Sequence, residues 1–151
     1  MKSVFKDVNG NTINVVKHTL DILNKNQDVE IHIGTDSQNR KRKTTYSTVI
    51  AYKFGTRGVH LINTRVHVPK IKDIEERLRK ETYLTMEVAM WLQEKIPSIK
   101  LQIDMDYNGD AKHLSNKVVD QMKGWAVGVG FKVNIKPYSQ IATKAADHFC
   151  R

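Results

Sequence analysis

The chain has 151 residues, which suffices for one ordinary domain and is too short for two comfortable ones. It holds 25 Lys and Arg against 16 Asp and Glu, a formal net charge of +9 that favours a polyanionic partner, above all nucleic acid. The sequence has no apolar run of ~20 residues, which excludes a membrane span, and no signal-peptide core. Its single cysteine, Cys150, excludes a disulfide framework and a cysteine zinc site. Together these features favour a cytoplasmic protein.

Apolar residues at three- and four-residue steps predict an amphipathic helix over residues 12–26, with Asn11 or Thr12 as its N-cap. β-branched and aromatic residues then predict three strands with short connections, typical of an antiparallel meander: residues 29–35, 45–54 and 59–68. Helices and strands alternate afterwards: a helix over residues 72–95, a strand over 99–105, a helix over 111–127, a strand over 131–136 and a short helix after Ser139. This order predicts one α/β domain over residues 1–151, with a mixed five-stranded sheet and helices on both faces.

Glu81 is the one acid of the long predicted helix that points toward the protein. At 100° per residue, and with Ile74 set at zero, Glu81 falls at about 340°, inside the apolar stripe. Glu76, Glu87 and Glu94 fall near 200° to 220°, on the opposite face. A buried carboxylate is costly unless it is paired or binds a metal, so Glu81 is either a ligand or a partly exposed edge acid paired with Arg77, Lys80 or another base.

Further acids lie at the ends of predicted strands and in the last helix. Asp36 follows an apolar strand, where it either serves a site or forms an Asp-Ser turn. Asp104 and Asp106 end the fourth strand and share a face if that strand continues. Asp147 falls about 165° from the small apolar face of its helix and could simply be solvated. Hard oxygen ligands without cysteine suit Mg²⁺ or Mn²⁺, and two such ions about 4 Å apart can hydrolyse a phosphodiester.

The element order and these acids resemble the ribonuclease-H-like superfamily, and more closely the ribonuclease H-like YkuK family. The resemblance covers residue 29 to the end, which leaves residues 1–28 as an N-terminal helical extension. It is carried by Ile33-Gly34-Thr35-Asp36-Ser37-Gln38, Lys80-Glu81-Thr82, Ile103-Asp104 with Asn108-Gly109, Gly124-Trp125, Gly130-Phe131 and Ala146-Asp147. It implies that the first three strands are antiparallel and that the last two run parallel to the first. It also implies catalytic, metal-binding acids at Asp36, Glu81, Asp104 and Asp147, with Asp106 as an alternative or an addition to Asp104.

Arg40, Lys41, Arg42 and Lys43 form the densest basic run, in the predicted loop between the first two strands. They either contact phosphates near Asp36 or form a solvated hairpin tip, and the net charge favours phosphate contact. His148, next to Asp147, is a candidate for assisting proton transfer or product release.

The sequence therefore predicts a Mg²⁺- or Mn²⁺-dependent nuclease acting on RNA, an RNA–DNA hybrid or structured DNA. In this hypothesis Asp36 bridges both ions, Glu81 and Asp104 hold one of them, and Asp147 holds the other. The alternative is a non-catalytic nucleic-acid-binding module on the same fold, and a structural interaction protein is a third class. Fold alone does not decide among these, because one fold serves many functions.

Overall fold

A computed structural model describes residues 3–105, 116–135 and 141–150 of the chain. Its helices are α1 (Val15–Lys25), α2 (Ile74–Lys95), α3 (Asn116–Val129) and α4 (Ile141–Cys150), and its strands are β1 (Phe5–Asp7), β2 (Thr12–Ile13), β3 (Glu30–Arg40), β4 (Lys43–Lys53), β5 (Val59–Pro69), β6 (Leu101–Met105) and β7 (Lys132–Ile135). The strands form one sheet in the order β2-β1-β5-β4-β3-β6-β7. β4 runs antiparallel to both β3 and β5, whereas β6 runs parallel to β3 and β7 parallel to β6. The predicted order of antiparallel and parallel strands is confirmed.

The prediction of five strands is wrong, because the sheet has seven. Residues 1–28 were expected to supply only a helix, but β1 and β2 pair with each other and β1 extends the sheet beyond β5. Phe5 is buried in the core, and Thr12 and Ile13 are held by this pairing. The helix consequently begins at Val15, with the Asn14 side chain accepting a hydrogen bond from Lys17 N at 3.2 Å.

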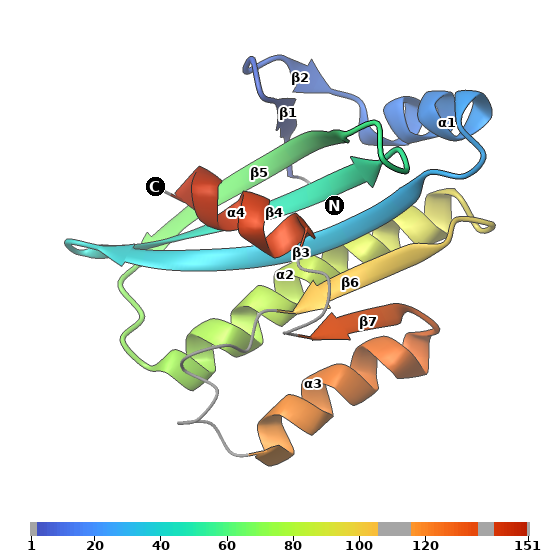
Figure 1. Ribbon diagram of the computed structural model, residues 1–151. Coiled ribbons are helices and arrows are strands. Elements are labelled where there is room, and N and C mark those ends of the chain that lie inside the picture. The colour runs from blue at the N-terminus through green and yellow to red at the C-terminus, as the bar shows by residue number, and fades with distance from the viewer. Residues whose placement is uncertain (1–2, 106–115, 136–140, 151) are drawn as a thin grey trace.

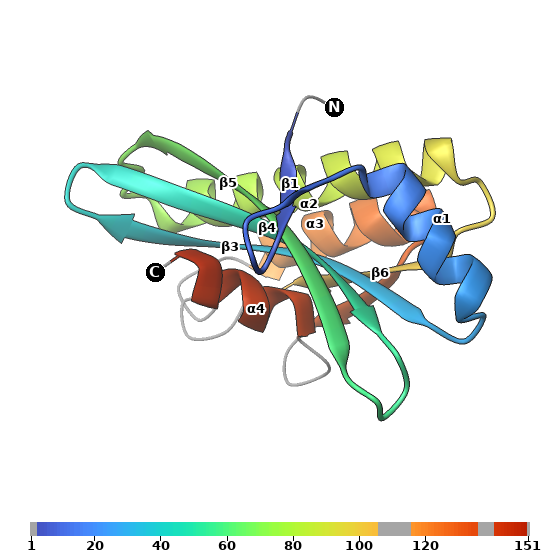
Figure 2. The ribbon, with the colours of Figure 1, turned by 90° about the horizontal axis from the view of Figure 1, so that it is seen from above.

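The helices cover both faces of the sheet, as predicted. Figures 1 and 2 show α4 on one side of the sheet and α2 with α3 on the other. Ile31 and Ile33 of β3 lie in the large core beneath α2, and Val49 and Ala51 of β4 pack against α4. Side chains of a strand alternate between faces, so His32, Gly34 and Asp36 point to the α4 side. Within the described residues no helix is both long and apolar enough to cross a membrane.

The central strand β3 is longer than its neighbour β6, and this difference positions the candidate site. β3 was expected to end at residue 35, but it continues to Arg40. Its pairing with β6 ends at Gly34 and Asp104, whereas its pairing with β4 continues to Arg40 and Lys43. Residues 35–40 therefore extend past β6 into an arm, about 20 Å long at 3.4 Å per residue, in which β4 pairs with β3 on one side and with β5 on the other.

Candidate functional site

The candidate acids come from four elements and meet one short stretch of β3. Asp36 belongs to that stretch, and Asp104 is paired with Gly34 at the end of β6. Glu81 of α2 accepts a hydrogen bond from Ser37 Oγ at 2.5 Å. Asp147 of α4 accepts one from Gln38 Nε2 at 2.7 Å. Residues 34–38 of β3 thus connect all four acids that the sequence predicted. Asp106 lies outside the described residues.

Glu81 is buried on the inner face of α2, as the helical periodicity predicted, with only 7% of its surface exposed. The Ser37 hydroxyl that binds it is itself oriented by Arg77, whose Nε donates to Ser37 Oγ at 3.3 Å and whose Nη2 donates to Ser37 O at 3.1 Å. Hydrogen bonds of this kind offset the cost of burying a carboxylate. Ser37 was not identified from the sequence as a site residue, although it directly follows Asp36, and Arg77 was named only as a candidate partner of Glu81.

Asp36 is half-buried within β3, so the alternative of an Asp-Ser turn is wrong. Its Oδ1 accepts a hydrogen bond from Ser37 N at 2.9 Å, and its backbone carbonyl accepts one from Cys150 Sγ at 3.3 Å. Burial raises the pKa of the Cys150 thiol to about 12, and the charges of Asp36, Glu81 and Asp147 add to this effect. The charges of these three carboxylates therefore all influence the Cys150 thiol at the end of α4.

Asp104 is sealed from solvent, with 2% of its surface exposed, and it connects three elements. Its Oδ2 accepts a hydrogen bond from Ala142 N at 2.9 Å, which fixes the first turn of α4. Its Oδ1 accepts one from Asn134 Nδ2 at 2.8 Å and lies 3.0 Å from His32 Nδ1. An ionised carboxylate offers about four acceptor positions, so these contacts leave about one for another ligand.

Asp147 does not lie on a solvated face, which was the alternative that its helical position left open. It is half-buried and held by Gln38 of β3.

The close approach of α4 to the sheet depends on Gly34. A Cβ at Gly34 would lie 2.9 Å from Thr143 Cγ2 and 3.1 Å from Ala142 Cβ. His148 is exposed and contacts Phe149 edge-on, so its role in proton transfer stays a prediction.

Glu81 and Asp104 line the same small cavity, together with Thr35, Leu78, Thr82, Thr85 and Met105. Its volume of about 10 Å³ matches roughly one water molecule. Glu81 can offer carboxylate oxygens to this space, which is the chemistry that Mg²⁺ or Mn²⁺ requires, whereas the Asp104 carboxylate is held on the α4 side by Ala142 and Asn134. Within residues 3–105, 116–135 and 141–150, however, no three His, Cys, Asp or Glu side chains are already arranged as a metal site. The donor chemistry fits such an ion, and binding would require the carboxylates to adjust.

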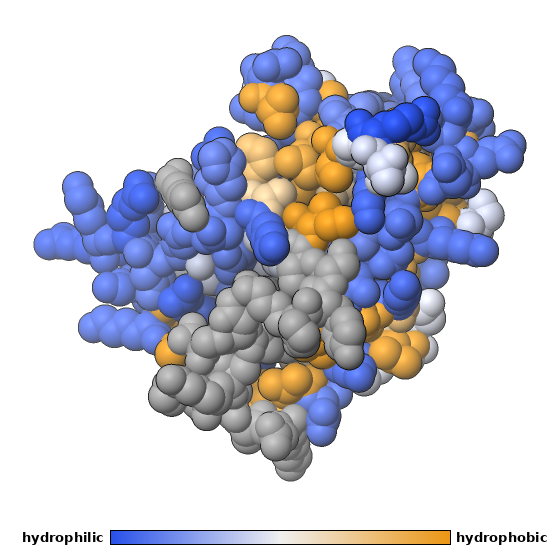
Figure 3. Space-filling view, in the orientation of Figure 1, coloured by the Kyte–Doolittle hydropathy of each residue, from blue (hydrophilic) through white to orange (hydrophobic). Residues whose placement is uncertain are grey.

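The basic run lies at the tip of the β3–β4 arm. Arg40, Lys41, Arg42 and Lys43 are all exposed, and Lys41 takes a positive φ of 56° in the turn. Lys70 N donates a hydrogen bond to Arg42 O at 3.0 Å and ties the arm to the segment before α2. The arm projects at the left of Figure 1, and Figure 3 shows hydrophilic side chains over this end. Arg40 lies four residues beyond Asp36, about 14 Å along the strand.

A mixed sheet with a 3-2-1-4-5 core order (β5-β4-β3-β6-β7) and acids around its central strand is compatible with the ribonuclease-H-like class. The model of the family described as Ribonuclease H-like matches residues 13–151. The chain belongs to this family, as the resemblance of its acid-bearing segments predicted. None of the curated proteins with which the chain was compared matches it. Membership suggests a nucleic-acid-related function.

Proposed function

We propose that the protein is a divalent-metal-dependent nuclease that hydrolyses phosphodiester bonds in RNA, an RNA–DNA hybrid or structured DNA. The observation that carries the proposal is the meeting of Asp36, Glu81, Asp104 and Asp147 at residues 34–38 of β3, at the base of a basic arm. Carboxylates brought from separate elements to one place repel one another without cations, so their convergence favours a metal-dependent function over a purely structural one.

Asp36, Glu81, Asp104 and Asp147 are the residues that would hold Mg²⁺ or Mn²⁺. Bound ions of this kind activate a water molecule and stabilise the leaving oxygen of the phosphodiester. The protein contributes orientation: Arg77 fixes Ser37, and Ser37 fixes the Glu81 carboxylate. The exposed side chains of Arg40–Lys43 bind phosphates of the same nucleic acid at a distance from the cleaved bond.

Cleavage assays of an Asp36→Asn variant test this function directly. Labelled RNA, hybrid, duplex and branched DNA are incubated with Mg²⁺ or Mn²⁺, and the variant is expected to lose cleavage while it keeps its fold and its binding of nucleic acid. Asp28→Asn is the matched control, because Asp28 is an exposed acid that precedes β3. Persistent cleavage in Asp36→Asn would refute the role of Asp36.

Thermal melting supplies a second readout that does not depend on finding the substrate. An ion that binds only the folded protein raises the melting temperature by mass action. Mn²⁺ is therefore expected to raise the melting temperature of the wild type and of Asp28→Asn, but not of Asp36→Asn. An equal rise in all three proteins would show that the ion binds elsewhere.

A non-catalytic nucleic-acid-binding module is the second candidate function. It is favoured by the Asp104 carboxylate, which already accepts hydrogen bonds from Ala142 N and Asn134 Nδ2 and so has a structural role. Such a module would bind nucleic acid with a steep dependence on salt and would show no cleavage with any divalent ion. The same substrate panel distinguishes the two functions.

A further inference from the structure

A line of basic side chains crosses the α4 face of the sheet, beside the candidate acids. Val49 of β4 packs against α4, and Asn63 and Lys6 lie in the same row of paired residues, so all three share that face. The residues two and four positions after Asn63 on β5 share it as well, and so does the first residue of β4. The line consists of Lys43, His67, Arg65 and Lys6, in that order, and we call it the cationic track.

The members of the cationic track are exposed and evenly spaced. Lys43 pairs with Pro69, and Lys6 pairs with Asn63, so each lies one strand and two residues from the next member of the track. Successive Cα atoms are therefore about 7–8 Å apart, at 3.4 Å per residue and about 4.8 Å between strands. An even line of charge matches the repeating phosphates of a polynucleotide, whereas a small anion requires cations that gather around one point.

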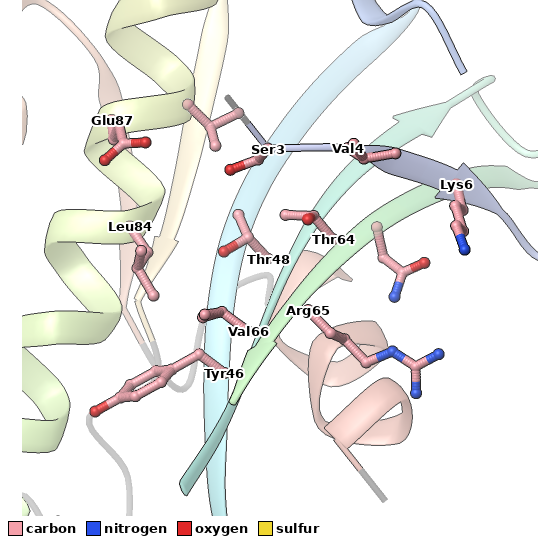
Figure 4. A pocket seen from close by; sticks show the side chains of 12 residues that line it. Ser3, Val4, Lys6, Tyr46, Thr48, Thr64, Arg65, Val66, Leu84 and Glu87 are labelled. Carbon is pink, nitrogen blue, oxygen red and sulfur yellow. The ribbon is translucent and has the colours of Figure 1, made fainter. Parts of the chain in front are cut away.

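The strands beneath the track add no negative charge to it. The sequences of β4 and β5 contain neither Asp nor Glu. Figure 4 shows Lys6 and Arg65 on the opposite side of β5 from Leu84 and Glu87 of α2, so the exposed acid of that helix faces another part of the surface. The track therefore presents a positive potential that attracts a polyanion.

Arg65 connects the track to the candidate site. It pairs with Ser47, which pairs with Asp36, so Arg65 lies two strands, or about 10 Å, from Asp36. Its Nη1 donates a hydrogen bond to Phe149 O at 3.3 Å, which holds the guanidinium beside the C-terminal end of α4. A guanidinium has five N–H donors, so most of them remain for a phosphate, which it can bind through two parallel hydrogen bonds.

His67 occupies the corresponding place in the next row. It pairs with Thr45, which pairs with Gln38, the residue that holds Asp147. The Nδ1 atom of His67 lies 2.8 Å from Thr45 Oγ1, which leaves Nε2 as the ring nitrogen for a phosphate oxygen. Side chains that are oriented in advance lose less conformational entropy when they bind.

We propose that the cationic track binds the phosphate backbone of a single nucleic-acid strand, which runs from the arm across β5 to β1 and passes the candidate acids at the end of α4. A flexible strand can follow one line of cations over a twisted sheet, whereas each backbone of a stiff duplex winds away from it. The inference rests on the proposed function in one respect, that the partner is nucleic acid. It requires neither a metal ion nor cleavage.

Substitution of Arg65 and Lys6 by glutamine tests the track, and Arg57→Gln is the matched control. Arg57 is an exposed arginine in the turn between β4 and β5, at the other end of the same hairpin. Binding of a labelled single-stranded oligonucleotide is measured by fluorescence anisotropy in EDTA at several salt concentrations. The slope of log K against log salt concentration is expected to fall by about 0.7 in Arg65→Gln and by about 1.4 when Lys6→Gln is added, because each phosphate contact on a single strand contributes about 0.7. Arg57→Gln is expected to keep the wild-type slope.

Three results would overturn the proposal. An equal fall of the slope in Arg57→Gln would mean that only net charge matters. Charged side chains also protect open strand edges, and β1 pairs with β5 only at Ile62 and Asn63. A double variant that self-associates by light scattering and keeps the wild-type slope would assign the charges to that edge. Displacement of the oligonucleotide by inorganic phosphate at the same phosphate concentration as a competing oligonucleotide would identify a site for a single anion.

The test separates the cationic track from the nuclease site. The Lys6→Gln, Arg65→Gln double variant is expected to keep the Mn²⁺-dependent rise in melting temperature that Asp36→Asn loses, because neither residue is among the candidate ligands. A wild-type slope in the double variant, together with metal-dependent cleavage by the wild type, would refute the track alone. A lowered slope in a protein that cleaves none of the substrates would support the track and refute the nuclease.

Discussion

Gly34 is the position at which a single methyl group should separate α4 from the sheet. A Cβ there would meet Thr143 Cγ2 at 2.9 Å, Ala142 Cβ at 3.1 Å and Asp104 O at 3.1 Å. One of these neighbours is backbone and the others belong to a packed helix, so the new methyl fits only if α4 shifts. Overpacking of this kind costs about 1–3 kcal/mol, offset by about 0.4–1 kcal/mol from the smaller entropy of the unfolded chain.

The net cost of Gly34→Ala is therefore about 1–2 kcal/mol, which corresponds to a fall in melting temperature of about 2–8 °C for a domain of this size. The matched control is Gly124→Ala on α3, where no heavy atom lies within 4 Å of the added Cβ. Alanine is a better helix former than glycine, so this variant should melt at or above the wild-type temperature. Both proteins are measured by thermal and urea unfolding.

The same variant should impair the candidate site, because α4 carries Asp147 and its first turn is bound to Asp104. A shift of α4 would lengthen the Ala142 N to Asp104 Oδ2 contact and move Asp147 away from Gln38. We therefore expect Gly34→Ala to lose the Mn²⁺-dependent rise in melting temperature, whereas Gly124→Ala keeps it. A Gly34→Ala protein with wild-type melting and a wild-type response to Mn²⁺ would refute the close packing described for α4.

Three further measurements test other parts of the molecule. Replacement of the four basic residues Arg40–Lys43 by glutamine should lower the slope of log K against log salt concentration for duplex binding by up to about 3–4, because each neutralised phosphate contributes about 0.9. An unchanged slope would show that the arm does not contact phosphates. Burial and the charge of His60 lower the pKa of His18, so the folded state binds this proton less readily than the unfolded state, and stability should fall as the pH drops below about 6.5. Urea midpoints between pH 7.5 and 5.5 should decline less steeply in His18→Gln, and an identical decline would assign the effect to other groups. Because the pKa of Cys150 is raised to about 12, iodoacetamide at pH 8 should label the native protein very slowly and the denatured protein fully; rapid native labelling would show that the end of α4 opens.

Periodicity was sufficient to predict the core of the fold. The apolar and β-branched segments predicted five strands and the intervening helices in their correct order, because each is long enough for its period to be visible. The two additional strands could not be predicted in this way. Phe5–Asp7 and Thr12–Ile13 are three and two residues long, and they are strands only because β1 pairs with β5 and β2 with β1.

The polar end of β3 illustrates a second limit of sequence reasoning. From Asp36 to Arg40 the residues have no apolar face, and such a stretch resembles a turn or loop. In the structure this stretch remains a strand because every residue from Asp36 to Arg40 pairs with a residue of β4. Strand continuation in this arm is therefore decided by tertiary hydrogen bonding rather than by burial of apolar side chains.

The candidate site was predictable to different degrees at its different acids. Glu81 followed from the 100° rotation of a long helix, in which one misplaced charge is conspicuous. Asp147 lies on a helix of ten residues, whose small face of alanines does not show clearly which side of the helix packs against the sheet. Its partner Gln38 is also far away in sequence. The orientation of Asp147 depends on how α4 crosses β3, which a sequence pattern does not specify.

Asp104 has two roles that a substitution would remove together. Its carboxylate fixes the start of α4 through Ala142 N and is also one of the four acids of the candidate metal site. Asparagine at this position would offer one oxygen in place of two, so it would both weaken the attachment of α4 and reduce the negative charge of the candidate site. Loss of activity in such a variant would combine a displaced Asp147 with a missing ligand. Asp36 is half-buried and lies within a fully paired segment of β3, so its replacement leaves α4 in position. For this reason the chemistry is best tested at Asp36, and the coupling between α4 and the sheet at Gly34.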